Sequence, residues 1–335
     1  MITTNQDLTP LNTFGIQAIA ASFARFSSVS ELRSCLHGNE FKDLLILGGG
    51  SNVLFTQDVD ALVLRNEIQG FEVQWEDSSY AYVKVGSGMV WHEFVLRCLE
   101  LNLGGVENLS LIPGSVGASP MQNIGAYGVE IKDVFHSLEA YHIATGDIHT
   151  FDGEQCEFGY RESVFKRKLK GKYVIVAVTF RLSKHPKINS SYGAIDAELK
   201  KMGISQPSIQ DISKAVIAIR SSKLPDPKVL GNAGSFFKNP VVEVSIMEKI
   251  KENYPDVPNY PAEAGKCKLA AGWLIEQAGW KGFREGNYGV HALQALVLVN
   301  YGGSTGHEVY ELSSRIIADI ETKFGVTLER EVNIL

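Results

Sequence analysis

The pattern of apolar and polar positions predicts alternating strands and helices along the chain. Short apolar runs between glycine or charged residues predict buried strands, and apolar residues three and four positions apart predict amphipathic helices. The predicted strands are 44–47, 53–55, 61–64, 80–86, 137–141, 173–180, 295–300 and 327–335. The predicted helices are 30–36, with Ser30 as its cap, 91–101, 209–220, 270–278 and 305–324.

The order of these elements predicts three regions, 1–66, 67–222 and 223–325, with the terminal strand 326–335 returning to the first region. A chain of 335 residues is long enough for such a division. The proline-containing segment Lys223-Leu224-Pro225-Asp226-Pro227 is the expected junction between the second and third regions.

Composition narrows the class of protein. A hydrophobic content of 44% is typical of a globular protein, and the net charge of -6 argues against nucleic acid or an anionic membrane as partner. The four cysteines form no C-x-x-C pair, and the histidines have no metal-ligand spacing, so we expect free thiols and no metal site. The polar N-terminus and the lack of a long apolar run predict a cytoplasmic protein.

Two glycine-rich loops are candidates for binding phosphate. Gly48-Gly49-Gly50-Ser51-Asn52 follows a predicted strand, and Pro113-Gly114-Ser115-Val116-Gly117 forms the second loop. No Gly-Lys-Ser/Thr follows the first loop, so it is not a P-loop. Two such loops without lysine favour a dinucleotide diphosphate held by backbone amides, with Asn123 and Tyr127 as further donors. The alternative for each loop alone is a tight turn.

Three side chains are candidates for acid or electrostatic chemistry. Ser235 lies between glycines and two phenylalanines, so it is either a proton donor in a dry, tightly turned loop or an ordinary residue of a turn. Arg161 is expected in a turn, where it would bind a carboxylate unless it is a solvated surface group. Alternation places Glu331 on one face with Glu329, which is also the pattern of an edge strand with a polar outer face.

Taken in order, these segments resemble the UDP-N-acetylenolpyruvoylglucosamine reductases, flavoenzymes that complete UDP-N-acetylmuramate for bacterial peptidoglycan. The resemblance covers nearly the whole chain. It is carried by the segments 12–15, 47–52, 112–117, 123–128, 160–161, 223–225, 231–240 and 271–275. One position departs from the family pattern, because the terminal Glu-Val-Arg is Glu331-Val332-Asn333 here.

The resemblance implies an α+β architecture. A vanillyl-alcohol-oxidase-type two-part FAD-binding fold would occupy 1–66 and 67–222, and a separate α/β substrate-binding domain would occupy 223–325. FAD would be bound without a covalent link, and NADPH would be the co-substrate. The substrate would be UDP-N-acetylglucosamine enolpyruvate, and the protein would act as a monomer with no nucleic-acid or membrane partner.

The resemblance also implies roles for individual residues. Ser235 would be the general acid, with Arg161 and Glu331 as electrostatic partners. The implied FAD contacts are Gly48, Gly49, Gly50, Ser51, Asn52, Ile112, Pro113, Gly114, Ser115, Gly117, Asn123, Gly125, Tyr127 and Ile175. The implied substrate contacts are Tyr160, Tyr192, Lys223, Asn239 and Gln294, and Tyr192 would be the mobile tyrosine of one of the two classes of the family. Two rival functions remain at this stage, an FAD oxidase of an alcohol or sugar and a non-catalytic sugar-nucleotide binding protein.

Overall fold

The computed structural model describes residues 1–37, 41 and 43–335, which form two compact units. Unit 1 comprises Met1–Gln6, Ala20–Gly49 and Asp60–Ser222, and unit 2 comprises Asp7–Ile19, Gly50–Val59 and Lys223–Leu335. The longest segment of unit 2 begins at Lys223. The division of the chain into the three regions 1–66, 67–222 and 223–325 stays a prediction.

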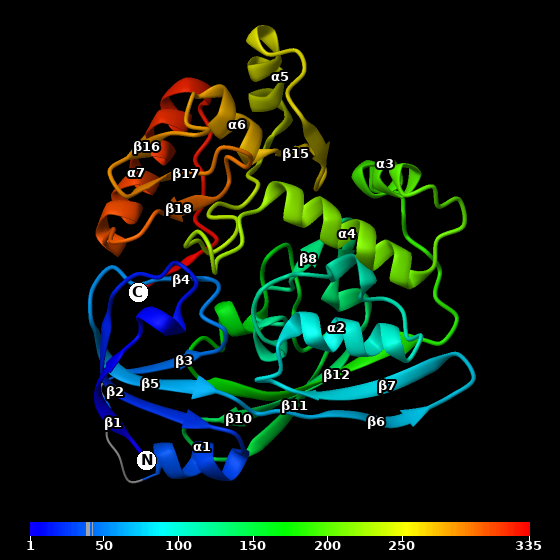
Figure 1. The fold of residues 1–335 in the computed structure, drawn as a ribbon, viewed down its shortest axis with the longest axis vertical. Helices are drawn as coiled ribbons and strands as arrows, with labels where there is room; N and C mark the ends of the chain where they lie inside the picture. Colours follow the sequence, from blue (N-terminus) through cyan, green and yellow to red (C-terminus); the bar gives the residue numbers. More distant parts are fainter. Residues whose placement is uncertain (38–40, 42) are drawn as a thin grey trace. The chain divides into compact units, whose positions relative to one another are not determined.

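Unit 1 is built on two sheets (Figure 1). The first has the strand order β1-β2-β5-β3, and the second is antiparallel with the order β11-β10-β12-β7-β6. The strands are β1 (Thr3–Asp7), β2 (Ile19–Phe26), β3 (Leu44–Leu47), β5 (Val59–Asn66), β6 (Phe71–Glu76), β7 (Tyr80–Gly86), β10 (Phe135–His142), β11 (Ile148–Asp152) and β12 (Tyr173–Ser183), with the hairpin β8 (Gly125–Ala126) and β9 (Val129–Glu130). The helices are α1 (Val29–Leu36), α2 (Trp91–Glu100), α3 (Gly193–Lys201) and α4 (Ile209–Lys223).

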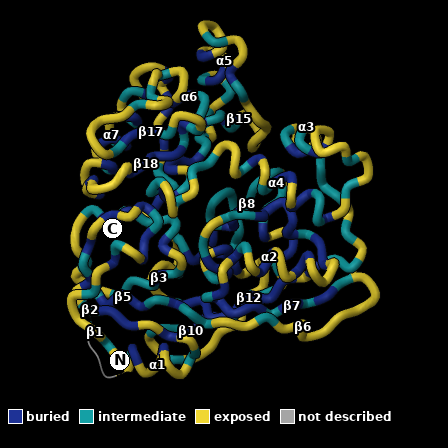
Figure 2. Tube along the Cα trace, viewed as in Figure 1, coloured by how far each residue is buried: buried dark blue, intermediate teal, exposed yellow. Residues whose placement is uncertain are grey.

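Strand β12 is apolar along most of its length because both of its faces are buried. Val178 and Phe180 face the core beneath α2, whereas Val174 and Val176 belong to the cluster that α1 and the first sheet complete. The Phe94 ring of α2 stacks on Phe180, with ring centroids 4.7 Å apart. The edge strand β6, in contrast, is largely exposed (Figure 2).

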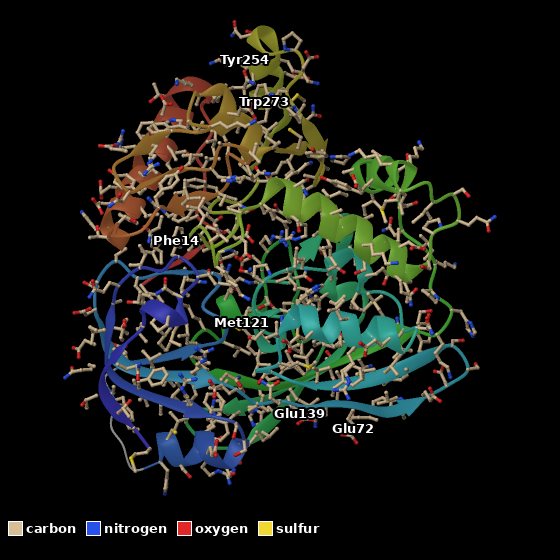
Figure 3. All side chains as sticks on the ribbon, in the orientation of Figure 1. Phe14, Glu72, Met121, Glu139, Tyr254 and Trp273 are labelled. Atoms are coloured by element: carbon tan, nitrogen blue, oxygen red, sulfur yellow. The ribbon has the colours of Figure 1, made fainter. Side chains whose placement is uncertain are left out.

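Unit 2 contains three helices around three small sheets. The helices are α5 (Val244–Asn253), α6 (Ala271–Gln277) and α7 (Gly306–Phe324). The strands are β4 (Val53–Leu54), β13 (Val241–Glu243), β14 (Asn259–Pro261), β15 (Lys266–Leu269), β16 (Arg284–Glu285), β17 (Tyr288–Val290), β18 (Leu298–Asn300) and β19 (Asn333–Ile334). Tyr254, directly after α5, packs on Trp273 of α6, and their ring centroids lie 5.6 Å apart (Figure 3). A capping box of Thr305 and Glu308 begins α7, and Gly325 ends it in the left-handed conformation.

Most predicted elements are present, with three corrections. Ser28, not Ser30, caps α1, because its side chain accepts a hydrogen bond from the Glu31 amide. The predicted strand 327–335 is wrong for most of its length, since only β19 pairs continuously, in parallel with β4. The buried alternation of Val326, Leu328 and Val332 comes from an extended segment without a regular ladder. The predicted strand 295–300 is shortened to β18. The elements that were not predicted are α3, α5 and the strands β1, β2, β6, β8, β9, β11 and β13 to β17.

The expectation of free thiols is confirmed, because all four cysteines are unbridged and buried. Within the described ranges, no helix is long and apolar enough to cross a membrane.

Candidate functional site

The parts of the two glycine-rich loops that belong to unit 1 lie against each other. A Cβ atom built on Gly48 would lie 2.6 Å from Ser115 Oγ, and one built on Gly49 would lie 3.2 Å from the Gly114 Cα. Strand β3 ends at Leu47 and delivers the first loop to this contact. Side chains at these glycines would collide with the facing loop, so the two loops pack closely against each other, and we call this pair of loops the cradle. This geometry fits the expected flavin contacts.

Two buried polar residues hold the second loop on the sheet. Ser87 receives a hydrogen bond from the Gly117 amide (2.8 Å) and donates from its own amide to the Val176 carbonyl (3.1 Å). The Asn66 side chain donates to Ser87 Oγ (2.8 Å) and to the Ile175 carbonyl (3.2 Å). Two expected flavin contacts, Gly117 and Ile175, are therefore joined through Asn66 and Ser87, which sequence reasoning missed. No local pattern marks these two residues, because their burial arises from sheet packing.

The other flavin candidates of the two loops are divided between the two units. Ile112 is half-buried against the core of the second sheet, and Pro113 next to it is exposed. Gly50, Ser51 and Asn52 belong to unit 2, where Gly50 has a φ of +64° and lies close to the Leu11 carbonyl.

Asn123 is bound within unit 1 through its side chain, and its expected contact with FAD stays a prediction. It is fully buried, and its amide donates to Glu130 Oε2 (2.9 Å) and to the Gly159 carbonyl (3.0 Å). Its Oδ1 accepts from the Lys132 amide at 3.2 Å. The side chain is thus engaged within the protein, and its contact with Gly159 supports the turn that carries Arg161.

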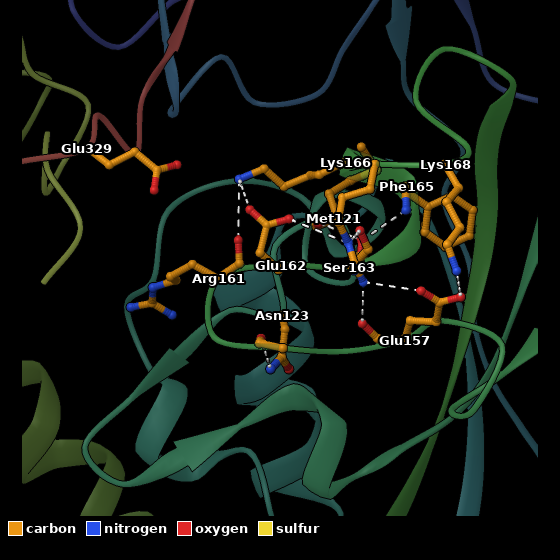
Figure 4. A network of polar contacts seen from close by, with 12 residues as sticks. Met121, Asn123, Glu157, Arg161, Glu162, Ser163, Phe165, Lys166, Lys168 and Glu329 are labelled. Atoms are coloured by element: carbon orange, nitrogen blue, oxygen red, sulfur yellow. Dashed lines mark hydrogen bonds and ion pairs between the residues drawn. The ribbon is translucent and has the colours of Figure 1, made fainter. Parts of the chain in front are cut away.

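Arg161 lies in a tight turn, as the sequence predicted. Gly159 and Glu162 form a β-bridge across the turn, and Arg161 adopts a φ of +55°, which is uncommon for a residue other than glycine. Its guanidinium donates to the Gly125 carbonyl at 2.9 Å, and its own carbonyl accepts from Lys166 Nζ at 3.3 Å. Figure 4 shows the guanidinium pointing away from the ion pair of Lys166 with Glu162. The strained turn and the Gly125 contact therefore aim a cation in a defined direction.

Arg220, near the end of α4, is a functional candidate that sequence reasoning missed. Its Nε donates to the Leu111 carbonyl at 3.3 Å, and it shares a hydrogen bond with the Tyr127 hydroxyl. Burial lowers the pKa of Arg220, and the neighbouring charge of Arg161 lowers it further. A buried cation beside a second cation makes this part of unit 1 a candidate for binding an anionic ligand.

Tyrosines surround these two arginines in unit 1. The Tyr192 ring meets the Tyr127 ring edge-on, with centroids 5.3 Å apart, and Tyr192 is 46% exposed. Burial raises the pKa of Tyr127, so its hydroxyl is neutral and able to donate. The Tyr160 ring lies 5.8 Å from the Arg161 guanidinium carbon. Expected substrate contacts and an expected flavin contact are thus gathered around one cationic patch.

In unit 2, Ser235 lies in a short extended segment. This segment pairs with the segment of Leu296 and with the segment of Glu331. The Phe236 amide donates to the Leu296 carbonyl, and the Phe236 carbonyl accepts from the Glu331 amide, each at 2.8 Å. Gly234 has a φ of +71°, which confirms the predicted sharp turn. Phe236 and Phe237 are buried in the core, but Ser235 itself is exposed. The expected dry environment is therefore wrong for the protein alone, since Ser235 is exposed although both phenylalanines are buried.

The other candidates of unit 2 are Asn52, Asn239, Gln294 and Lys223. Asn52 donates to the Glu331 carbonyl at 3.3 Å, so it contacts the terminal segment. Asn239 Oδ1 accepts from the Ala271 amide (2.9 Å) at the start of α6, and Gln294 Oε1 accepts from the Leu296 amide (3.3 Å). Lys223 is exposed at the end of α4. Because Arg161 and Ser235 lie in different units, their action on one carbon stays a prediction.

Comparisons with known proteins give one consistent result. The family model of the UDP-N-acetylenolpyruvoylglucosamine reductase C-terminal domain matches residues 226–335, and the model of an FAD binding domain matches residues 20–152. The chain is 53% identical to UDP-N-acetylenolpyruvoylglucosamine reductase of Pseudomonas syringae pv. tomato, over 98% of this chain and 97% of that protein. It is 50% identical to the Flavobacterium johnsoniae enzyme of the same name, over 100% of this chain and 99% of that protein.

A solved structure shows the same fold. The crystal structure of UDP-N-acetylenolpyruvylglucosamine reductase from Thermus caldophilus superposes with a TM-score of 0.70 at 22% identity, covering 100% of this chain and 98% of that one. The predicted α+β architecture, with an FAD-binding fold followed by a separate C-terminal domain, is confirmed.

Proposed function

Because the chain belongs to the UDP-N-acetylenolpyruvoylglucosamine reductase family, we propose that it uses NADPH and bound FAD to reduce UDP-N-acetylglucosamine enolpyruvate to UDP-N-acetylmuramate. The observation that carries this proposal is the 53% identity over 98% of the chain, since the matched length includes both the glycine loops and the Ser235 loop. We expect the reaction to serve peptidoglycan precursor synthesis in the cytoplasm, with the protein acting as a monomer.

The cradle of unit 1 holds the cofactor by its main chain. When bound, FAD supplies the means to carry hydride from NADPH to the enol ether. Gly48, Gly49, Gly114 and Ser115 would hold it without a covalent link, since glycine-rich main chain lets a ligand approach closely. Gly117 and Ile175 keep the second loop in place through Ser87 and Asn66.

The cationic patch of unit 1 binds the charged parts of the substrate. Arg161 holds the enolpyruvyl carboxylate through charge-assisted hydrogen bonds and stabilises the negative charge that develops there. Arg220 and Tyr127 add a second cation and a neutral donor for an anionic group. Tyr160, Tyr192, Lys223, Asn239 and Gln294 complete the proposed substrate contacts.

Ser235 supplies the proton. Hydride adds to the terminal vinyl carbon, and the adjacent carbon, which bears the carboxylate, takes the proton from Ser235 Oγ. The exposure of Ser235 means that bound substrate must cover it during the reaction. The same exposure lets water return the proton after the product leaves. Glu331, whose amide donates to the Phe236 carbonyl, is an electrostatic partner of Ser235 in this step.

Rapid mixing of the two half-reactions tests this assignment. In Ser235→Ala, reduction by NADPH should keep its rate, while oxidation by the enol ether should slow by about 10²–10⁴-fold, the usual contribution of a general acid. Ser245→Ala, an exposed serine of α5, is the matched control. Equal slowing of both half-reactions would refute the role of Ser235.

Rapid reoxidation of the reduced flavin by oxygen would favour the oxidase alternative. A colourless protein that cannot take up FAD would favour the non-catalytic binding protein.

A further inference from the structure

Lys238 is a buried cation three residues after Ser235 whose function the mechanism does not explain. Its side chain is 10% exposed and forms an ion pair with Glu329, whose side chain is 70% exposed. Burying a lysine costs solvation energy, and an apolar residue in its place would often stabilise the fold as well or better. The presence of the charge therefore points to a role beyond stability.

The same two residues are also joined through their main chains. The Lys238 amide donates to the Glu329 carbonyl at 2.9 Å, next to the β-bridge between Phe237 and Arg330. The Glu331 amide then donates to the Phe236 carbonyl at 2.8 Å. This short antiparallel pairing connects the loop of Ser235 with the segment of Glu331.

The buried Phe236, Leu328 and Val332 favour one alignment of this short pairing, and the side-chain ion pair of Lys238 with Glu329 adds to that preference. A shift by one residue would move Glu331 by about 3.3 Å along the segment and turn its side chain to the other face. On its far side, the segment is held to α7 by Arg330, whose guanidinium donates to Ser313 Oγ and Ser314 Oγ, each at 2.7 Å. The Lys238 side chain binds the same segment on its other side, next to the loop of Ser235.

We propose that Lys238 and Glu329 are a positioning pair that fixes the alignment of the Ser235 loop against the Glu331 segment. The inference rests on the proposed function, because it assigns the alignment to the proton-transfer half of that reaction. Lys238 acts by positioning Ser235 and Glu331, and it does not bind the substrate. The alignment of the two segments therefore depends on Lys238 and also on the exposed Glu329.

The test compares Lys238→Met, Glu329→Gln and the double variant as holoenzymes. A misplacement of about 1 Å costs up to about a hundredfold in rate, so we expect the substrate half-reaction to slow by about 10- to 100-fold in each variant. Reduction by NADPH and FAD content should stay at wild-type values, and the double variant should be no slower than either single variant. Lys238→Arg should recover most of the rate. Glu263→Gln, which breaks the more exposed Lys266–Glu263 pair of the same unit, is the matched control.

Two outcomes would overturn the proposal. A normal substrate half-reaction in Glu329→Gln, with a slow one in Lys238→Met, would mean that Lys238 binds the substrate directly. Equal slowing of both half-reactions, in step with a lower melting temperature, would mean a purely structural pair.

Amide hydrogen exchange separates this proposal from the proposed function. In Glu329→Gln, the amides of Lys238 and Glu331 should exchange faster than in the wild type, whether or not the enol ether is the substrate, and unchanged exchange would overturn the pair. A wild-type protein that fails to reduce the enol ether would overturn the proposed function instead.

Discussion

Replacing Gly117 by alanine tests the packing of the second glycine loop on the sheet. The added Cβ would lie 2.6 Å from the Ser87 Cβ and 3.0 Å from the Ser87 carbonyl oxygen. Ordinary carbon–carbon contacts begin near 3.5 Å, so the two backbones must separate by about 1 Å. Ser87 cannot move away easily, because it is fully buried and bound to Val176 and Asn66. The loop must therefore shift.

Overpacking of this kind typically costs about 1–3 kcal/mol. If the loop relieves the strain by leaving its place in the cradle, FAD should bind about 5- to 150-fold more weakly, since 1.4 kcal/mol corresponds to a factor of ten. The assay is titration of the apoprotein with FAD by flavin fluorescence, accompanied by the melting temperature of the apoprotein.

Gly193→Ala is the matched control, because an added Cβ there meets no atom within 4 Å and the backbone needs no positive φ. An FAD affinity for Gly117→Ala equal to that of the wild type, with an unchanged melting temperature, would refute this account of the loop. A lower melting temperature with normal FAD affinity would show that the strain is spread into the sheet instead.

Substitutions at two further residues, Glu107 and Arg220, test buried ionisable groups. Burial raises the pKa of Glu107 above its ordinary value of 4.5, although the Gly105 amide donates to its carboxylate. The stability that comes from this raised pKa is present below about pH 4.5 and is lost as the pH rises through the folded-state pKa. Glu107→Gln should therefore lose less stability between pH 4.5 and pH 8 in denaturant unfolding, and identical profiles would contradict this sign. Arg220→Gln should weaken binding of the enol ether or of FAD by about 10- to 150-fold, as expected for lost hydrogen bonds to a charged group, whereas Arg220→Lys should keep part of the affinity. Unchanged affinity for both ligands in calorimetry would exclude an anion site at Arg220.

Local patterns determined the elements whose apolar periodicity is strong. Strand β7 has the predicted bounds, and α2 and α7 each match to within one residue, because buried side chains recur at the period of the element itself. The Gly234 turn and the Arg161 turn were also visible in the sequence, since glycine and turn residues act on the backbone locally. The Ser28 cap was missed because three nearby serines are chemically equivalent and only backbone geometry selects one.

Tertiary structure alone decided which distant residues meet. The contact of Gly48 with Ser115, the burial of Arg220 beside Tyr127 and the pairing of Lys238 with Glu329 all join segments that are far apart in the chain. It also decided that Asn123 is engaged within the protein and that Ser235 is exposed. The sequence by itself determined the local conformations and the residue types available for chemistry. Their burial, partners and charge environment depend on packing between distant segments, and no local pattern encodes that packing.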